Sequence, residues 1–280
     1  MSASSEKLDD WLDKQAVVED DITAFPLKAL AATLDREESG NTVPPLWHWL
    51  YFLPVAPLSE VGPDGHPKRG GFLPPVPLPR RMWAGGRLTF HAPLKIGEHA
   101  KRISAIANIE DKTGRSGRLV FVTVQHTIEV DGELKLEEEH DIVYRDAPQE
   151  GARPQQPAPA PEGETWRRTI DADAVMLFRY SALTFNGHRI HYDHPYVTQV
   201  EGYPGLVVHG PLIATLLVDL VRQELPQATL QSFAFRAHRP TFADQPFMVC
   251  GKPAADGKTI DLWAKDHQGY LTMRATAALA

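Results

Sequence analysis

The pattern of apolar and polar positions gives the two halves of the chain the same plan. From Gly86 onward, apolar and polar residues alternate in long segments that glycine-containing turns separate, which is typical of antiparallel strands. The first set of segments covers residues 87–93, 99–112, 118–130 and 134–145, and the second set covers residues 232–240, 246–254, 259–266 and 270–279. We therefore predict two antiparallel sheets, one in each half.

Helical patterns precede each set of strands. Residues 6–35 show a helical pattern, in which Pro26 begins a second segment. Residues 171–181 show a shorter helical pattern after a predicted strand at residues 165–170. Between Gly210 and Glu224, apolar residues repeat at i, i+1, i+4 and i+5, so this helix has a wide apolar face. Such a face predicts a helix buried against a sheet. Each half is thus expected to be an α+β unit, with its helix wrapped by its sheet.

Two proline-rich segments interrupt these patterns. Residues 40–83 combine many prolines with aromatic side chains, so we expect an ordered loop over a pocket, with short extended pieces such as residues 47–52. Residues 148–164 have too few apolar side chains to fold, which indicates an interdomain linker. The predicted domains are therefore residues 1–147 and 165–280.

Composition narrows the classes of function. The 280 residues carry 36 carboxylates against 29 Lys and Arg, and this net charge of −7 argues against general nucleic-acid binding. The chain has no run of about 18 apolar residues, so no membrane span is expected. The first residues lack the apolar core of a signal peptide. Cys250 is the only cysteine and lies in an apolar run, so we expect a buried thiol in a cytoplasmic, soluble protein.

The stretch Tyr180–Asp219 concentrates groups that titrate near neutral pH. It holds four of the twelve histidines, directly before the helix that begins at Gly210: His188, His191, His194 and His209. The local sequence leaves three uses open. The first three histidines stand three apart, as in a metal site, but residues 192–195 are turn-like and no HExxH motif is present. The second use is structural, with histidines that satisfy backbone groups. The third use is general acid–base catalysis beside a helix N-terminus.

Three short motifs resemble one enzyme family. Phe185–Asp193, Glu201–Pro204 and Val208–Pro211 resemble the MaoC-like (R)-specific enoyl-CoA hydratases, whose motif is Asp-x-Asn-x-x-His. The first half resembles the degenerate first unit of two-hotdog 3-hydroxyacyl-thioester dehydratases, and the whole chain is most similar to the 3-methylfumaryl-CoA (mesaconyl-CoA) hydratase branch. The resemblance implies an α+β double hotdog fold, with a degenerate hotdog in residues 1–147 and the catalytic hotdog in residues 165–280.

The resemblance also implies roles for the motif residues. His191 falls on the catalytic histidine, Asn186 stands in place of the usual aspartate, and His188 stands in place of the asparagine. Because an amide cannot take a proton from water, we expect His191 to be the main acid or base, with Asn186 holding water and His188 assisting. The backbone N–H of Gly210 is expected to stabilise the enolate oxygen.

Other residues near the motif have two possible uses each. We expect Asp193 to orient a histidine from behind, with proton transfer as the alternative. His209 either binds substrate or packs at the helix start, and Tyr203 either lines the acyl site or caps the core. One arginine is expected to bind a distal carboxylate, with surface ion pairing as the alternative for each: Arg80, Arg81 and Arg189.

The implied reaction is the addition of water to an enoyl-CoA. The expected substrate is 3-methylfumaryl-CoA or itaconyl-CoA, and the product is citramalyl-CoA. The alternatives are a fatty-acid type 3-hydroxyacyl-thioester dehydratase, a hotdog thioesterase and a non-catalytic acyl-thioester binding module. CoA enters as part of the substrate, and neither a metal nor another cofactor is expected. The expected partners are the acyl-CoA and further copies of the chain in a homodimer or higher homo-oligomer, with no nucleic acid and no membrane.

Overall fold

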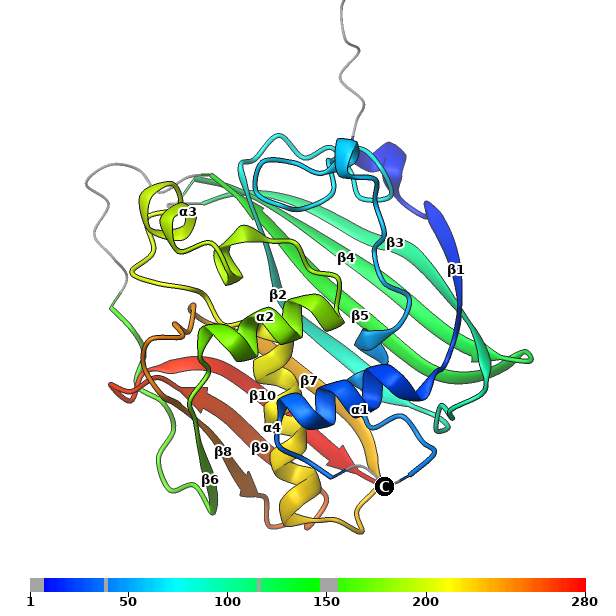
Figure 1. Ribbon diagram of the computed structural model, residues 1–280, viewed down its shortest axis with the longest axis vertical. Helices are drawn as coiled ribbons and strands as arrows, with labels where there is room; N and C mark the ends of the chain where they lie inside the picture. Colours follow the sequence, from blue (N-terminus) through cyan, green and yellow to red (C-terminus); the bar gives the residue numbers. More distant parts are fainter. Residues whose placement is uncertain (1–7, 38–39, 115–116, 147–155) are drawn as a thin grey trace, which may run out of the picture.

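A computed structural model describes residues 8–37, 40–114, 117–146 and 156–280. The ten strands of these residues form one continuous antiparallel sheet in the order β1-β3-β4-β5-β2-β7-β10-β9-β8-β6 (Figure 1). Their bounds are β1 Gln15–Asp21, β2 Arg80–Phe90, β3 His99–Gly114, β4 Gly117–Val130, β5 Glu133–Arg145, β6 Trp166–Ile170, β7 Leu230–Ala237, β8 Phe247–Pro253, β9 Thr259–Lys265 and β10 Leu271–Leu279. Each half therefore contributes five strands.

The two halves of the sheet join where β2 pairs with β7. This junction requires glycine, because a Cβ on Gly85 would lie 2.4 Å from the carbonyl oxygen of Phe235, and one on Gly86 would lie 3.0 Å from the ring of Phe235. Both glycines are thus needed for the strands of the two halves to approach one another.

The helix α4 (Gly210–Glu224) forms the centre of the C-terminal half, where it crosses the strands β6, β8, β9 and β10 (Figure 1). All residues from Leu212 to Val221 are buried. The described chain has three other α-helices and four 3-10 segments: α1 Ala24–Thr33, α2 Ala174–Leu183, α3 His194–Gln199, η1 Leu8–Trp11, η2 Trp47–Leu50, η3 Leu58–Glu60 and η4 Arg189–His191. This arrangement confirms the α+β double hotdog.

In the N-terminal half, the helix is shorter. The helix α1 has 10 residues against 15 in α4, and it packs on α2 from the other half. Its buried residues Leu27 and Leu30 share one core with Leu88 and Ile128 of the N-terminal sheet and with α4. A single apolar core therefore runs through both halves.

Two local predictions are wrong. Within residues 6–35, the segment Gln15–Asp21 is not helical but forms the strand β1, because its alternating half-buried and exposed side chains suit an edge strand beside β3. The piece at residues 47–52, expected to be extended, begins with the 3-10 helix η2. Leu46 at φ 71° starts this turn, which buries Trp47.

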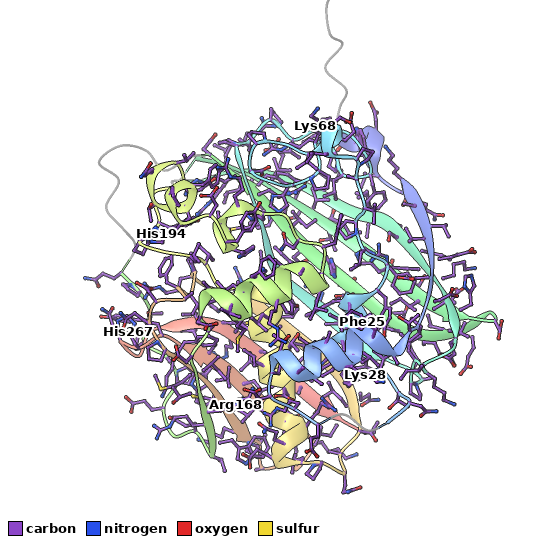
Figure 2. All side chains as sticks on the ribbon, viewed as in Figure 1. Phe25, Lys28, Lys68, Arg168, His194 and His267 are labelled. Carbon is purple, nitrogen blue, oxygen red and sulfur yellow. The ribbon has the colours of Figure 1, made fainter. Side chains whose placement is uncertain are left out.

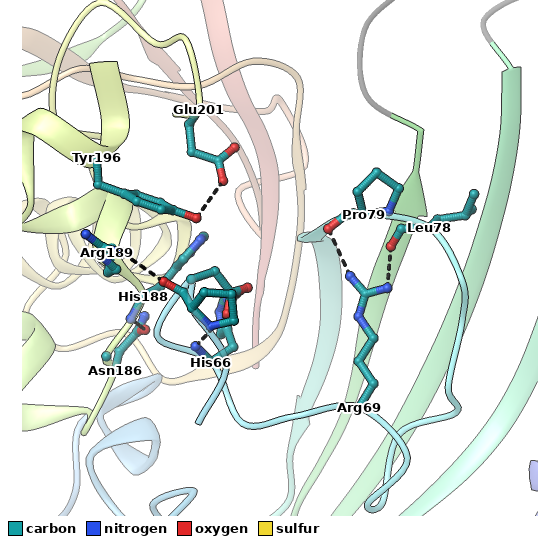
Figure 3. Close-up of polar contacts among 12 residues, drawn as sticks. His66, Arg69, Leu78, Pro79, Asn186, His188, Arg189, Tyr196 and Glu201 are labelled. Carbon is teal, nitrogen blue, oxygen red and sulfur yellow. Dashed lines mark hydrogen bonds and ion pairs between the residues drawn. The ribbon is translucent and has the colours of Figure 1, made fainter. Parts of the chain in front are cut away.

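The proline-rich segment before β2 is ordered, as predicted. The guanidinium of Arg69 donates to the carbonyl oxygens of Val76, Leu78 and Pro79, which closes the segment into a loop (Figure 3). Val76 and Leu78 pack on Val120 and other residues of the N-terminal sheet. This loop therefore lies over one face of that sheet.

The predicted linker is only partly described. Residues 147–155 lie outside the described residues, and the domain boundaries placed there stay a prediction. The next residues run beside the C-terminal sheet, where the N–H of Leu271 donates to Ala158 and that of Ala160 donates to Gly269. Cys250 is buried, as predicted, and burial raises the pKa of its thiol to about 11. No helix among the described residues is long and apolar enough to cross a membrane.

Candidate active site

His191 lies at the end of η4 with only 7 % of its surface exposed. A carbonyl oxygen only accepts, so the Nδ1–H of His191 donates to the oxygen of Val207 at 2.7 Å. This bond leaves Nε2 with its lone pair. Burial lowers the pKa of His191 to about 4, so the ring is neutral at neutral pH and able to take a proton.

His209 supports His191 from behind. The two rings stack with centroids 3.6 Å apart, and Nε2 of His209 lies 2.8 Å from the hydroxyl of Ser181. Its ring is 1 % exposed and its Nδ1 is buried without a hydrogen-bond partner in the described structure. Burial and the neighbouring histidines hold the pKa of His209 well below its ordinary value. Of the two uses considered for this residue, packing at the helix start is the one that fits.

His188 and Asn186 build the loop before η4. The side-chain oxygen of Asn186 accepts from the N–H of His188 at 3.0 Å, which fixes a turn. The ring of His188 stands perpendicular to that of His191, with centroids 5.4 Å apart. Burial, followed by the nearby His66 and His191, lowers the pKa of His188 to about 2. The oxygen of Asn186 is thus used in shaping the loop, and its role in holding water stays a prediction.

A segment of the N-terminal half completes this cluster. The backbone oxygens of Pro63 and Asp64 accept from the side chain and the N–H of Arg189, at 3.0 and 2.9 Å. The ring of His66 then lies beside that of His188 (Figure 3), with the ring centroids 4.0 Å apart. Sequence reasoning missed Asp64 and His66. The one signal available was a carboxylate and a histidine two residues apart around a glycine, inside the loop expected to cover the site.

The metal trio considered from spacing is not assembled. His194 is exposed in α3 (Figure 2), and the group of metal-ligating side chains that come together among the described residues does not include it, so the three-residue spacing of the motif histidines does not converge. Another trio, Asp64, His66 and His188, has ligand atoms within 4.8 Å of one another. Two imidazoles and a carboxylate are chemically suited to a divalent metal, so this trio is the metal candidate of the described residues.

Two of the three candidate arginines are committed to protein partners. Arg189 pairs with Asp193 at 2.7 Å and lies over the ring of Tyr196. Arg80 donates to the backbone oxygen of Glu201 at 3.0 Å and lies 5.7 Å from the ring of Tyr203. These contacts hold the segment after the motif in place.

Arg81 differs from both. Burial is the main cause that lowers the pKa of His66, the hydrogen bond to Asp64 opposes it, and the charge of Arg81 lowers this pKa further. The charge of Arg81 also lowers the pKa of His188. No carboxylate of the described residues forms an ion pair with it. Arg81 also acts on the hydroxyl of Tyr144, and its binding of a distal carboxylate stays a prediction.

The expectation for Asp193 is wrong. Its carboxylate caps α3 by accepting from the N–H of Tyr196 at 3.0 Å, and it pairs with Arg189 instead of a histidine. The turn after η4 places Asp193 at a helix start, where a carboxylate satisfies amide groups. Tyr203 lies between Arg80 and Phe242, 6.0 Å from the ring of the latter, outside the histidine cluster.

Gly210 lies at the start of α4, next to His209. The first N–H groups of a helix have no acceptor inside the helix and carry a partial positive charge. A Cβ on Gly210 would meet no atom within 4 Å outside its own helix, so the space beside this residue is open. The geometry is compatible with the predicted use of its N–H at a developing oxyanion.

Comparison with known proteins places this site in a wider group. The model of the family "hydroxyacyl-thioester dehydratase type 2" matches residues 46–243. The chain is 48 % identical to mesaconyl-C(4)-CoA hydratase from Chloroflexus aurantiacus, over 96 % of each chain. It is 29 % identical to the mitochondrial hydroxyacyl-thioester dehydratase type 2 of Schizosaccharomyces pombe, over 84 % of this chain and 89 % of that one.

Solved structures share the fold. A MaoC-like dehydratase from Phytophthora capsici superimposes with a TM-score of 0.71 at 13 % identity, over 98 % of this chain and 99 % of the other. HtdX from Mycobacterium tuberculosis superimposes with a TM-score of 0.69 at 16 % identity, over 94 % and 98 %. The double hotdog is thus common to all of them.

Proposed function

Because this chain belongs to the hydroxyacyl-thioester dehydratase type 2 family of hydro-lyases, we propose that it hydrates a branched, unsaturated dicarboxylic acyl-CoA of the mesaconyl type to citramalyl-CoA. The observation that carries this proposal is the 48 % identity, over 96 % of both chains, to a protein named mesaconyl-C(4)-CoA hydratase. Arg81 beside the histidines supports it, since a dicarboxylic acyl group presents a second carboxylate to the site.

In the proposed reaction, His191 begins the chemistry. Its neutral Nε2 takes a proton from water while the water oxygen bonds to the β-carbon of the enoyl thioester. The π electrons then move towards the thioester carbonyl, whose oxygen gains negative charge. The N–H of Gly210 is the proposed donor to that oxygen, a contact worth about 3–4 kcal/mol in the transition state of comparable enzymes. A proton delivered to the α-carbon completes the addition.

The reaction makes no demand for a redox group or a metal, because no electrons leave the substrate and a conjugated thioester is already polarised. We accordingly propose that CoA, as part of the substrate, is the only cofactor-like group bound. We also propose a cytoplasmic homodimer, because β1 and β6 end the described sheet and hotdog sheets can extend across subunits. Light scattering on the purified protein tests the dimer.

The test of function is a panel of enoyl thioesters with the purified protein. Loss of the conjugated thioester absorbance is followed for 3-methylfumaryl-CoA, itaconyl-CoA, crotonyl-CoA and a long-chain trans-2-enoyl-CoA. Preference for a branched dicarboxylic substrate supports the proposal. Preference for the long chain would instead make the protein a fatty-acid type 3-hydroxyacyl-thioester dehydratase. Binding without turnover of any substrate contradicts an enzymatic function.

A further inference from the structure

The motif has Asn186 where the enoyl-CoA hydratase motif that it resembles has aspartate, yet a carboxylate reaches the cluster from the other half of the chain, at Asp64. We propose that His66, oriented by Asp64, is a second acid–base residue of this site and delivers the proton to the α-carbon. Asp64 is then a positioning residue that acts through His66. The inference rests on the proposed hydratase function.

Asp64 and His66 form a closely defined pair. One carboxylate oxygen of Asp64 accepts from the N–H of His66 at 3.0 Å, and the other accepts from its Nδ1–H at 3.1 Å. A carboxylate that binds Nδ1–H fixes the tautomer of a histidine and stabilises its charged form, leaving Nε2 to exchange protons. Burial raises the pKa of Asp64, but the bonds from His66 outweigh this effect and hold that pKa well below its ordinary value. The carboxylate is therefore ionised at neutral pH.

The backbone around this pair is built to reach the motif. Gly65 has φ +89°, and a Cβ there would lie 1.8 Å from the carbonyl oxygen of Gly187. Conversely, a Cβ on Gly187 would lie 2.8 Å from the oxygen of Gly65. Two glycines, with the hydrogen bonds to Arg189, thus let the segments touch across 126 positions of sequence. Such a contact positions His66 instead of leaving it on a loose loop.

The histidines form a series that connects the two proton-transfer groups. His188 lies between His66 and His191, with ring centroids 4.0 and 5.4 Å away. The environments differ: burial and then Arg81 lower the pKa of His66, but the bond from Asp64 opposes this, whereas His191 has only a carbonyl partner and its pKa falls to about 4. Pairs whose surroundings push their pKa values apart are suited to act as acid and base. His66 therefore holds a proton more readily, and the neutral ring of His191 is free to accept one from water.

The proton balance of hydration follows from this division. Water gives one proton to Nε2 of His191 as its oxygen bonds to the β-carbon. The resulting enolate takes a proton from Nε2 of protonated His66 as the α-carbon–hydrogen bond forms. His191 ends with one proton more and His66 with one fewer, and transfer through His188 or solvent restores both. Dehydration runs the same steps in reverse.

Metal binding by Asp64, His66 and His188 is the competing use of these groups. The oxygen of Asp64 and Nδ1 of His66 face each other in a hydrogen bond, an arrangement that serves a dyad directly. The experiment includes a chelator arm for this reason. Full hydration activity after chelation supports the dyad, and activity lost to a chelator and restored by a divalent cation overturns it.

The decisive experiment measures kcat, KM and the pH profile of hydration for three variants. His66→Gln is expected to lower kcat by roughly 100- to 10,000-fold with little change in KM. Asp64→Asn should shift the basic limb of the profile to lower pH, because the charged form of His66 loses its partner. Asp64→Glu should restore part of that shift. The charged or titratable groups that face His66 are Asp64, Arg69, Arg81, His188 and His191.

A matched control is the exposed pair of His99 and Asp21, whose Nδ1 and carboxylate oxygen are 2.7 Å apart. Asp21→Asn should change neither kcat nor the profile. A wild-type enzyme that hydrates the panel while His66→Gln keeps full kcat overturns this inference and leaves the proposed function intact. A wild-type protein that hydrates nothing removes both.

Discussion

His191 combines burial, a fixed tautomer and a ring nitrogen that is available to accept a proton. It is 7 % exposed, its Nδ1 is bound to a carbonyl oxygen, and its Nε2 has no hydrogen-bond partner in the described part of the chain. Replacement by Gln removes the proton acceptor, so we expect kcat to fall by roughly 100- to 10,000-fold. Thioester absorbance measures the effect, and His194→Gln, at an exposed position, serves as the control that should retain full activity.

Arg81 is expected to select the acyl group. A charge-assisted bond contributes about 1.5–3 kcal/mol, so Arg81→Met should raise KM for a dicarboxylic enoyl-CoA by about 10- to 100-fold. KM for crotonyl-CoA, which has no distal carboxylate, should change little. Arg118→Met is a suitable control because Arg118 is an exposed arginine paired with Asp111. Equal effects of Arg81→Met on both substrates would contradict carboxylate recognition.

At this scale, the sequence predicted the members of the site that lie in one stretch. His188 and His191 do lie together, because their spacing across a short turn is a local property. Asp64 and His66 could not be paired with them, since a contact between residues far apart in sequence depends on the tertiary fold. The prediction for Asp193 was wrong for a related reason, because whether a carboxylate contacts a histidine or caps a helix depends on where that helix begins.

The contact between the loop at Gly65 and the motif can be tested separately from the histidines. Gly65→Ala places a methyl group against the backbone oxygen of Gly187, so the segments must separate. We expect kcat to fall at least about 10-fold, with a loss of about 1–3 kcal/mol in unfolding free energy from backbone strain. Enzyme assays and urea denaturation measure the two effects.

Gly70 offers a matched control in the same loop. Its φ is +90°, but a Cβ there would meet nothing within 4 Å. Gly70→Ala therefore carries the same strain without the collision, and should destabilise the protein while leaving kcat close to that of the wild type. A similar loss of activity in both variants would show that the loop, and not the contact, is what matters.

Among the elements, periodicity succeeded where one face of a segment is clearly buried. The strands β3 to β5 and β7 to β10 alternate strongly, and α4 has the predicted bounds. Periodicity failed for β1, because an edge strand with three acidic residues has little apolar contrast and its neighbours resemble a helix. The register that places β2 beside β7 is set by glycines whose close contacts exist only in the folded sheet.

At the scale of the whole molecule, Asp219 links both halves. Its carboxylate, 3 % exposed in α4, accepts from Arg168 of β6 at 2.9 Å and from Arg36, which follows α1, at 2.9 Å. Asp219→Ala removes the buried carboxylate that both cations share, and Arg168 keeps only its bond to the side chain of Gln223, so we expect a loss of about 3–5 kcal/mol in unfolding free energy. Urea denaturation measures it. Asp111→Ala, which breaks the exposed pair with Arg118, should cost at most about 1 kcal/mol.

The histidine cluster also makes the stability of the whole fold depend on pH. Burial lowers the pKa of His191 to about 4 and that of His188 to about 2, and it holds that of His209 well below the ordinary value. In the unfolded chain these groups titrate near about 6.5, so below that pH the unfolded state binds more protons than the folded state. Their contribution is therefore fully present above about pH 6.5 and is lost as the pH falls towards the folded values.

Each such histidine that is protonated only on unfolding changes the unfolding free energy by up to about 1.4 kcal/mol per pH unit. We expect the Tm from calorimetry to be nearly constant from about pH 8 to 7 and to fall progressively below about pH 6.5, where unfolded histidines gain protons. His191→Gln should make that decline shallower, because one of the buried neutral rings is gone, whereas the exposed His194→Gln should not. A Tm that stays level or rises between about pH 6.5 and 5 would mean that His191 and His188 are charged in the folded state, which would contradict the assignment of His191 as a neutral base.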